Sequence, residues 1–150
     1  MQDRIEKQIE ITAPLSRVWQ ALTDARQFGE WFLVKMDGPF VAGKRVGGQI
    51  THPGYEHLRM EIEVNAIEPE TLFSFKWHPY AVDPKVDYEQ EESTLVEFHL
   101  RPIAAGTSLT VTESGFDRIP SARRAEAFLR NDQGWVQQMN NIQAYVAKAS

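Results

Sequence analysis

The sequence predicts an α+β protein in which a curved antiparallel sheet of about six to seven strands wraps over one long C-terminal helix. Three observations support this prediction. Apolar and polar residues alternate in short runs separated by turn residues, as in the hairpins of an antiparallel sheet. Two short helical patterns follow the first of these runs. The last segment alone has a long helical repeat of apolar residues, so it is the element able to cover the apolar face of the sheet.

The first predicted strand begins at Ile5, and its alternation places Lys7 on the same face as the isoleucines. Residues 12–14 predict a helix start, with residue 12 or 13 near the N-cap and Pro14 in the first turn. Residues 23–25 interrupt the helical spacing. A second short helix then carries three aromatic residues: Phe28, Trp31 and Phe32.

Short alternating runs then predict the strands of a meander. Residues 58–65 and 73–78 alternate on either side of a turn at residues 68–71, which contains a proline. Residues 94–101 and 109–114 alternate on either side of a turn at residues 105–107. Hairpins at this spacing predict an antiparallel sheet that contacts the core with one face.

Residues 78–92 form the longest predicted connection, and they show no periodicity. A loop of this length is either functional or a flexible insert. Because long loops on a rigid sheet often carry function, we expect this loop to border the mouth of a cavity. Its carboxylates would disfavour anionic ligands and tolerate neutral or cationic ones. These acids are Asp83, Asp87, Glu89, Glu91 and Glu92.

Residues 121–147 predict one long amphipathic helix that Ser121 can cap. Gly134 lies inside this helix and suggests a kink or a close approach to another backbone, because an interior glycine weakens a helix. Arg123 and Arg124 are expected to lie in solvent. One apolar stripe should pack across the concave face of the sheet: Phe128, Trp135, Met139, Ile142 and Val146.

The composition narrows the class of function. The 150 residues fit a single domain spanning residues 1–150, and a net charge of −5 gives nucleic acid no general attraction. The absence of cysteine excludes a disulfide scaffold, a thiol nucleophile and a Cys-ligated cluster. The four histidines form no metal-binding motif and no dinucleotide fingerprint is present, so we expect neither a metal nor a cofactor. With no signal peptide and no apolar run of membrane-spanning length, we expect a cytoplasmic protein.

The inward faces of the predicted sheet and helix supply the candidate ligand-binding residues. Bulky aromatics and flexible methionines suit either a full core or an adaptable apolar pocket. Glu113 shares a face with Leu109 and Val111, where it either contacts a ligand or pairs with an arginine or a helix end. Asp132 either shares this polar site or lies where the helix leaves the sheet. The candidates are Trp31, Met60, Phe75, Trp77, Phe98, Glu113, Trp135 and Met139.

Two groups of residues resemble a known superfamily. Residues 9–14, residues 18–24 and the pair Trp31-Phe32 are similar to the opening of the START-like (SRPBCC, helix-grip) superfamily. Residues 109–116, 134–135 and 141–142 are similar to its branch related to the C-terminal domain of the Hsp90 ATPase activator Aha1. The resemblance implies a helix-grip fold, in which a curved sheet wraps over a long C-terminal helix. Residues 78–84 depart from the minimal pattern.

The superfamily includes lipid carriers, hormone receptors and polyketide cyclases, so the resemblance implies several functions. The leading hypothesis is binding of a small hydrophobic or amphipathic molecule in an internal cavity between the sheet and the C-terminal helix. One alternative is a cyclase- or hydratase-type enzyme that uses Glu113 as acid/base together with a histidine or an aspartate. Another is a chaperone-interacting module, although the N-terminal domain that makes the principal Hsp90 contact in that family has no room in 150 residues. A homodimer is left open.

Overall fold

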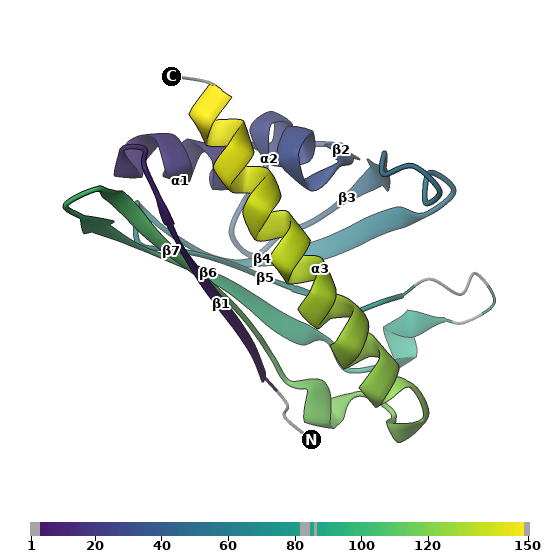
Figure 1. Cartoon of the computed structure of the whole chain (residues 1–150). Coiled ribbons are helices and arrows are strands. Elements are labelled where there is room, and N and C mark those ends of the chain that lie inside the picture. Colours follow the sequence, from purple (N-terminus) through teal and green to yellow (C-terminus); the bar gives the residue numbers. More distant parts are fainter. Residues whose placement is uncertain (1–3, 82–84, 86, 149–150) are drawn as a thin grey trace.

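The computed structural model describes residues 4–81, 85 and 87–148, and these residues build one seven-stranded antiparallel sheet and a long helix across it (Figure 1). The strand order is β1-β7-β6-β5-β4-β3-β2. The strands are β1 (Arg4–Ile11), β2 (Val34–Met36), β3 (Arg45–Ile50), β4 (Arg59–Glu68), β5 (Leu72–Trp77), β6 (Thr94–Ile103) and β7 (Gly106–Ser114). The α-helices are α1 (Leu15–Thr23), α2 (Ala25–Phe32) and α3 (Ser121–Lys148), and short 3-10 helices occupy Tyr88–Gln90 and Phe116–Arg118. The predicted fold class is therefore confirmed.

The long helix α3 runs diagonally across the sheet, while α1 and α2 lie together at the end that α3 reaches with its last turns (Figure 1). Its buried residues include Trp135, Met139, Ile142 and Val146, as the apolar stripe predicts. Phe128 is half-buried and packs against Phe116 with ring centroids 5.1 Å apart. The stripe thus closes the core between helix and sheet.

The strand register places the inward faces of β5, β6 and β7 next to one another. Phe75 of β5 lies opposite Val96 of β6, and Val96 lies opposite Glu113 of β7. Along β4 the register shifts by one residue between Val64 and Ala66, which is a β-bulge. The continuous register of the three central strands brings the ends of β5 and β7 and the start of β6 to the same side of the molecule.

The structure corrects the predicted start of α1 and excludes one of the two explanations for Gly134, the close approach to another backbone. Helix α1 begins at Leu15 with Pro14 itself at the N-cap, because the Pro14 carbonyl accepts from the backbone N–H groups of Arg17 and Val18. Gly134 makes no close approach to another backbone, since a Cβ atom added there would meet nothing within 4 Å. Helix α3 continues unbroken through this residue.

Membrane insertion by a helix has no support in the described part of the chain. None of its helices combines the length and the apolar character needed to cross a bilayer.

Candidate functional site

Glu113 is a fully buried acid that accepts hydrogen bonds from three elements. Its Oε2 accepts from Trp77 Nε1 at 2.8 Å and from Thr94 Oγ1 at 2.6 Å. Its Oε1 accepts from Trp135 Nε1 at 2.8 Å, and Asn131 Nδ2 lies 2.9 Å from Oε1 and 3.2 Å from Oε2. The carboxyl group therefore ties β5 and β6 to α3 from its position on β7.

The local sequence explains how these groups meet. Trp77 and Thr94 are register partners on β5 and β6, and Glu113 lies on the adjoining strand with its side chain on the same face. Asn131 and Trp135 are four residues apart on α3, so they share one face of the helix. The sheet presents the acceptor and the helix supplies half of the donors.

The donor set suits an ionised carboxylate. The indole N–H groups and the amide nitrogen can only donate, and an ionised carboxylate can only accept. A buried carboxylate is costly without such partners, and here both oxygens have at least two. Both carboxylate oxygens of Glu113 are thus already hydrogen-bonded to neighbouring side chains of the protein.

The two indoles that Glu113 holds stand close to each other. The ring centroids of Trp77 and Trp135 are 5.8 Å apart with an interplanar angle of 32°. Phe32 at the end of α2 contacts both, with centroids 6.1 and 6.2 Å away. These three rings form a wall between the buried carboxylate and the surface.

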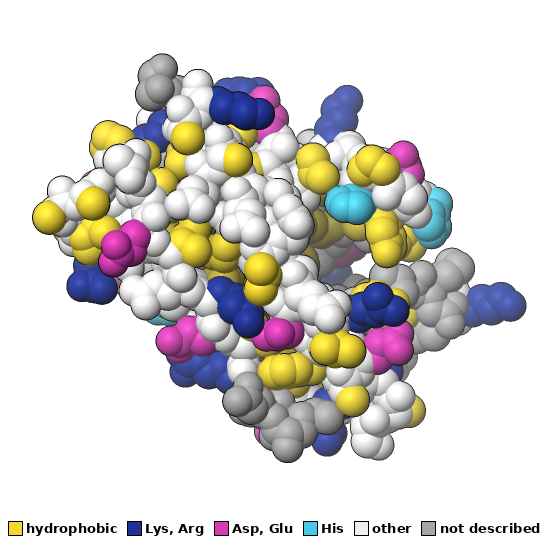
Figure 2. Space-filling model, in the orientation of Figure 1, with side chains coloured by type: hydrophobic (Ala, Val, Ile, Leu, Met, Phe, Trp, Pro, Cys, Tyr) yellow, Lys and Arg dark blue, Asp and Glu magenta, His cyan; other side chains and the backbone are white. Residues whose placement is uncertain are grey.

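A pocket of about 370 Å³ opens beside this wall, and we call it the main pocket. Its lining comes from the end of α2, from the β3–β4 hairpin, from the end of β5 and the described residues His78, Tyr80, Ala81 and Tyr88, and from α3. Figure 2 shows the molecule hollowed beside α3. The lining is mostly apolar or aromatic: Phe32, Ile50, Leu58, Met60, Trp77, His78, Tyr80, Ala81, Tyr88 and Asn131, with the charged residues Arg59 and Glu61.

A smaller hollow of about 160 Å³, which we call the side crevice, lies against α3. It shares Phe32, Trp77 and Asn131 with the main pocket, so these three residues border both hollows. The remaining lining comes from α3 alone: Gly134, Trp135 and Gln138.

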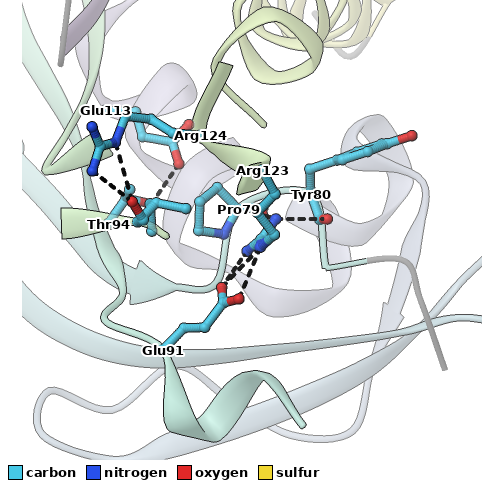
Figure 3. Close-up of polar contacts among 8 residues, drawn as sticks. Pro79, Tyr80, Glu91, Thr94, Glu113, Arg123 and Arg124 are labelled. Carbon is cyan, nitrogen blue, oxygen red and sulfur yellow. Dashed lines mark hydrogen bonds and ion pairs between the residues drawn. The ribbon is translucent and has the colours of Figure 1, made fainter. Parts of the chain in front are cut away.

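Arg123 fastens the segment after β5 to the start of α3 (Figure 3). Its guanidinium donates to both carboxylate oxygens of Glu91 at 2.7–3.0 Å and to the carbonyls of Pro79 and Tyr80 at 2.8 and 3.2 Å. It also lies 4.8 Å from the ring centroid of Tyr88. The expectation that Arg123 lies in solvent is wrong, because carbonyls and a carboxylate gather at this helix end.

Arg124 is likewise held, since it donates to the carbonyls of Ile119 and Asp117. The guanidinium of Arg130 lies 5.5 Å from the ring centroid of Tyr80. Arginines of α3 thus hold both tyrosines of the main pocket.

Four described residues of the 78–92 segment lie at the rim of the main pocket: His78, Tyr80, Ala81 and Tyr88. Gln90, Glu91 and Glu92 border a second hollow instead. Asp83 lies outside the described residues, as does the side chain of Glu89. Glu91 is paired with Arg123, so its charge is neutralised locally. The expected acidic character of this rim is therefore weaker than the sequence suggests.

The structure divides the candidate binding residues into two groups. Met60 and Trp77 line the main pocket, and Trp77 and Trp135 line the side crevice. Glu113 lines neither hollow and accepts hydrogen bonds from Trp77 and Trp135. The remaining four, which line neither hollow, are buried in the core: Trp31, Phe75, Phe98 and Met139.

These four residues are in the core because aromatic rings fill the space under the sheet. Phe75 and Phe98 have centroids 6.2 Å apart, and Phe98 packs edge-on against Trp135 at 5.7 Å. Trp31 is turned inward and donates its indole N–H to the Ala21 carbonyl at 2.7 Å. The hollow consequently lies at the side of the helix–sheet interface and is open to solvent.

Sequence reasoning missed several residues of this site. Asn131 could have been found from its spacing of four residues before Trp135, and Thr94 from its place on the inward face of β6. Tyr80 and Tyr88 carry no periodic signal, because they lie in an irregular segment. Asp132 does not join Glu113, since it pairs with Lys7 of β1 at 2.9 Å. Among the described residues no group of three or more acids or histidines could hold a metal ion.

A sheet that grips a long helix, with a hollow at its open side, defines a class of α+β proteins. Residues 12–147 match the family model described as activator of Hsp90 ATPase homolog 1-like protein, and the chain belongs to this family. The resemblance to the START-like superfamily is thereby confirmed. No curated protein matches the sequence.

Solved structures share the fold over nearly the whole chain. A protein from Mesorhizobium loti has 24% sequence identity and a TM-score of 0.77, with 98% of each chain covered. DynU16, a putative protein in the dynemicin biosynthetic locus, has 24% identity and a TM-score of 0.76, and the match covers 100% of this chain and 49% of that one. The Aha1 dimer from Colwellia psychrerythraea has 16% identity and a TM-score of 0.72, with 97% and 96% covered.

Proposed function

We propose that this chain binds a small hydrophobic or amphipathic molecule in the main pocket. The observation that carries the proposal is the aromatic lining of a hollow of about 370 Å³. This volume falls within the range of small-molecule sites, which are mostly apolar with a few placed polar groups. The lining here has that composition.

The polar groups at the pocket favour an amphipathic ligand over a purely apolar one. His78 borders the pocket, and its buried Nδ1 has no hydrogen-bond partner in the described structure. At the rim, Arg59 pairs with Asp37, so this cation is already engaged. A neighbouring hollow of about 310 Å³ is bounded by charged side chains such as Lys76, Glu63 and Glu92, and it suits an apolar ligand poorly.

The geometry favours binding over acid–base catalysis by Glu113. A general acid or base must come within hydrogen-bond reach of the reacting group. Both carboxylate oxygens are instead engaged by protein donors, behind the wall of indoles. Four large apolar residues of the described chain are exposed: Val41 and Tyr55 lie outside the helices and strands, and Leu129 and Val136 lie on α3. Two residues on one helix give a chaperone-binding face little support.

A homodimer remains part of the proposal, because the Colwellia psychrerythraea neighbour is described as a dimer. Analytical ultracentrifugation would test it: a mass of two chains is expected, and a mass of one chain at micromolar concentration would contradict it.

The test of ligand binding uses N-phenyl-1-naphthylamine, a neutral apolar dye whose fluorescence rises in apolar surroundings. The dye should bind the wild-type chain. Leu58→Glu puts a charge into the main pocket and should weaken binding at least tenfold, because burying an unpaired charge is costly. Val41→Glu, which replaces an exposed apolar residue outside the pocket, is the matched control.

Two results would contradict the proposal. One is the absence of dye binding to the wild-type chain. The other is equal loss of binding in both variants, since Leu58 lines the pocket and Val41 does not. Circular dichroism should show that both variants remain folded.

A further inference from the structure

We infer that the bound molecule is elongated, with a narrow apolar end that reaches from the main pocket into the side crevice, and that Gly134 keeps this crevice open. The inference rests on the proposed function and adds a ligand shape and a specificity-determining residue to it.

Neither the φ angle nor a close neighbouring backbone requires glycine at position 134. It lies in the middle of α3, where glycine is the least favourable residue after proline. Its φ is not among the positive values found at four other glycines of the described chain, and an added Cβ would meet nothing within 4 Å. Gly29 differs, because a Cβ there would lie 2.1 Å from the Val34 carbonyl oxygen.

The surroundings of Gly134 offer an explanation for the glycine at this position. Gly134 lines the side crevice together with the rings of Phe32, Trp77 and Trp135. A side chain at this position would project from α3 into open space at the crevice. The absence of a side chain therefore preserves room next to an aromatic wall, at a cost in helix stability.

The polar side chains of the crevice are already engaged. Gln138 donates to the Phe32 carbonyl at 3.1 Å, and Asn131 donates to Glu113. A ligand segment in the crevice would meet mainly the aromatic rings. The crevice is also less than half the size of the main pocket, at about 160 Å³ against 370 Å³. These features suit a thin apolar end such as an alkyl chain.

Hydrogen bonds hold in place two of the residues that border both hollows. Trp77 and Asn131 line both hollows, and Glu113 accepts a hydrogen bond from each of them. The same carboxylate holds Trp135 on the crevice side. A ligand that spans both hollows would thus lie along residues fixed by one buried group.

The test measures the affinity of 4-alkylphenols with two to eight carbons in the alkyl chain, by calorimetry or by displacement of N-phenyl-1-naphthylamine. In the wild-type chain the affinity should rise by up to about fourfold for each added methylene that is buried. Gly134→Leu should bind the shortest phenols as the wild type does and lose at least tenfold for the longest. Gly134→Ala should show a smaller loss in the same direction.

Stability should move in the opposite direction, which separates a blocked crevice from a damaged fold. Gly134→Ala should raise the melting temperature, because alanine favours the helix. Asn140→Ala is the control, since Asn140 is exposed on α3 and lines neither hollow. It should also raise the melting temperature while every affinity stays unchanged.

The other possible results distinguish failure of this inference from failure of the proposed function. An affinity series in Gly134→Leu identical to that of the wild type would overturn the inference. So would an equal loss for short and long phenols, or a wild-type affinity that does not depend on chain length. In these cases the proposed function survives. If no phenol and no dye binds the wild-type chain, the proposed function itself fails.

Discussion

Glu113 joins three elements of the fold through one carboxylate. Its oxygens take hydrogen bonds from β5, β6 and α3, and the side chain has no exposed surface. Two of its partners, Trp77 and Asn131, also line the main pocket. At the residue scale the stability of the fold and the shape of the candidate site therefore depend on the same group.

Glu113→Gln should destabilise the protein substantially while keeping its shape. The glutamine amide replaces one acceptor oxygen by a donor, which leaves N–H groups of the wall facing another N–H. Each buried donor left without an acceptor costs about 1–3 kcal/mol. Urea unfolding followed by tryptophan fluorescence would measure the loss.

Glu63→Gln is the matched control, because Glu63 is exposed on β4. It should change the free energy of unfolding by no more than about 0.5 kcal/mol. If Glu113→Gln were as harmless as this control, the carboxylate would not be holding the wall.

The inward position of Glu113 could be predicted from its residue parity with Leu109 and Val111. Its partners could not be predicted in the same way, because the register of α3 over the sheet decides which helix residue meets the carboxylate. One residue of difference separates Asn131, which contacts Glu113, from Asp132, which pairs with Lys7. Sequence spacing alone does not fix that choice.

At the scale of elements, the start of α3 and the segment after β5 form one unit. Arg123 holds two carbonyls, the carboxylate of Glu91 and the ring of Tyr88. His78, Tyr80, Ala81 and Tyr88 in turn line the main pocket. These contacts of Arg123, which we call the clamp, should therefore influence ligand binding more than the stability of the core.

Arg123→Ala should release this segment and speed the dissociation of N-phenyl-1-naphthylamine, as measured by stopped-flow fluorescence. The lost hydrogen bonds to charged groups are worth about 1.5–3 kcal/mol locally. Arg130→Ala removes a contact with the Tyr80 ring, worth about 0.5–1 kcal/mol, and should have a smaller effect. Equal dissociation rates in the wild type and Arg123→Ala would show that the clamp does not influence the pocket.

The other end of α3 is held by Tyr145. Burial and then the hydrogen bond to Glu30 raise the pKa of the Tyr145 hydroxyl above its ordinary value. A phenol with a raised pKa in the folded state favours folding fully below the ordinary pKa near 10, and this contribution is lost as pH rises through the raised value.

A tyrosine titration followed at 295 nm should therefore contain one component at higher pH than an ordinary tyrosine. Tyr145→Phe should remove that component and should flatten the alkaline loss of stability. A wild-type titration that is unchanged by this substitution would contradict the assignment.

At the scale of the whole molecule, periodicity predicted the sheet and the long helix because burial on one face leaves a repeating pattern. It also predicted the α3 stripe, since Trp135, Met139, Ile142 and Val146 are all buried. The location of the pocket was less accessible, because two irregular segments form much of its rim. Leu58 and Tyr88 reach the pocket only through the tertiary placement of their loops.

The predicted cavity beneath the helix and the observed open pocket differ for a physical reason. Phe73, Phe75 and Phe98 are large enough to fill the curved face of the sheet against α3. The main pocket and the side crevice instead lie beside Trp77 and Phe32, which line both of them. The curvature of the sheet predicts a hollow between sheet and helix, and the volume of the side chains on the sheet decides where that hollow lies.

Under the proposed function and the inference drawn from Gly134 together, an apolar ligand lies against Trp77 in the main pocket and extends to Trp135 in the side crevice, the two indoles that Glu113 holds. The most direct measurement is a ¹H–¹⁵N spectrum of the side-chain indole N–H groups during titration with N-phenyl-1-naphthylamine, since the chain has four tryptophans. We expect the signals of Trp77 and Trp135 to shift in a saturable way, and those of Trp19 and Trp31 to stay in place. Four signals that all stay fixed, or that all shift alike, would contradict the account.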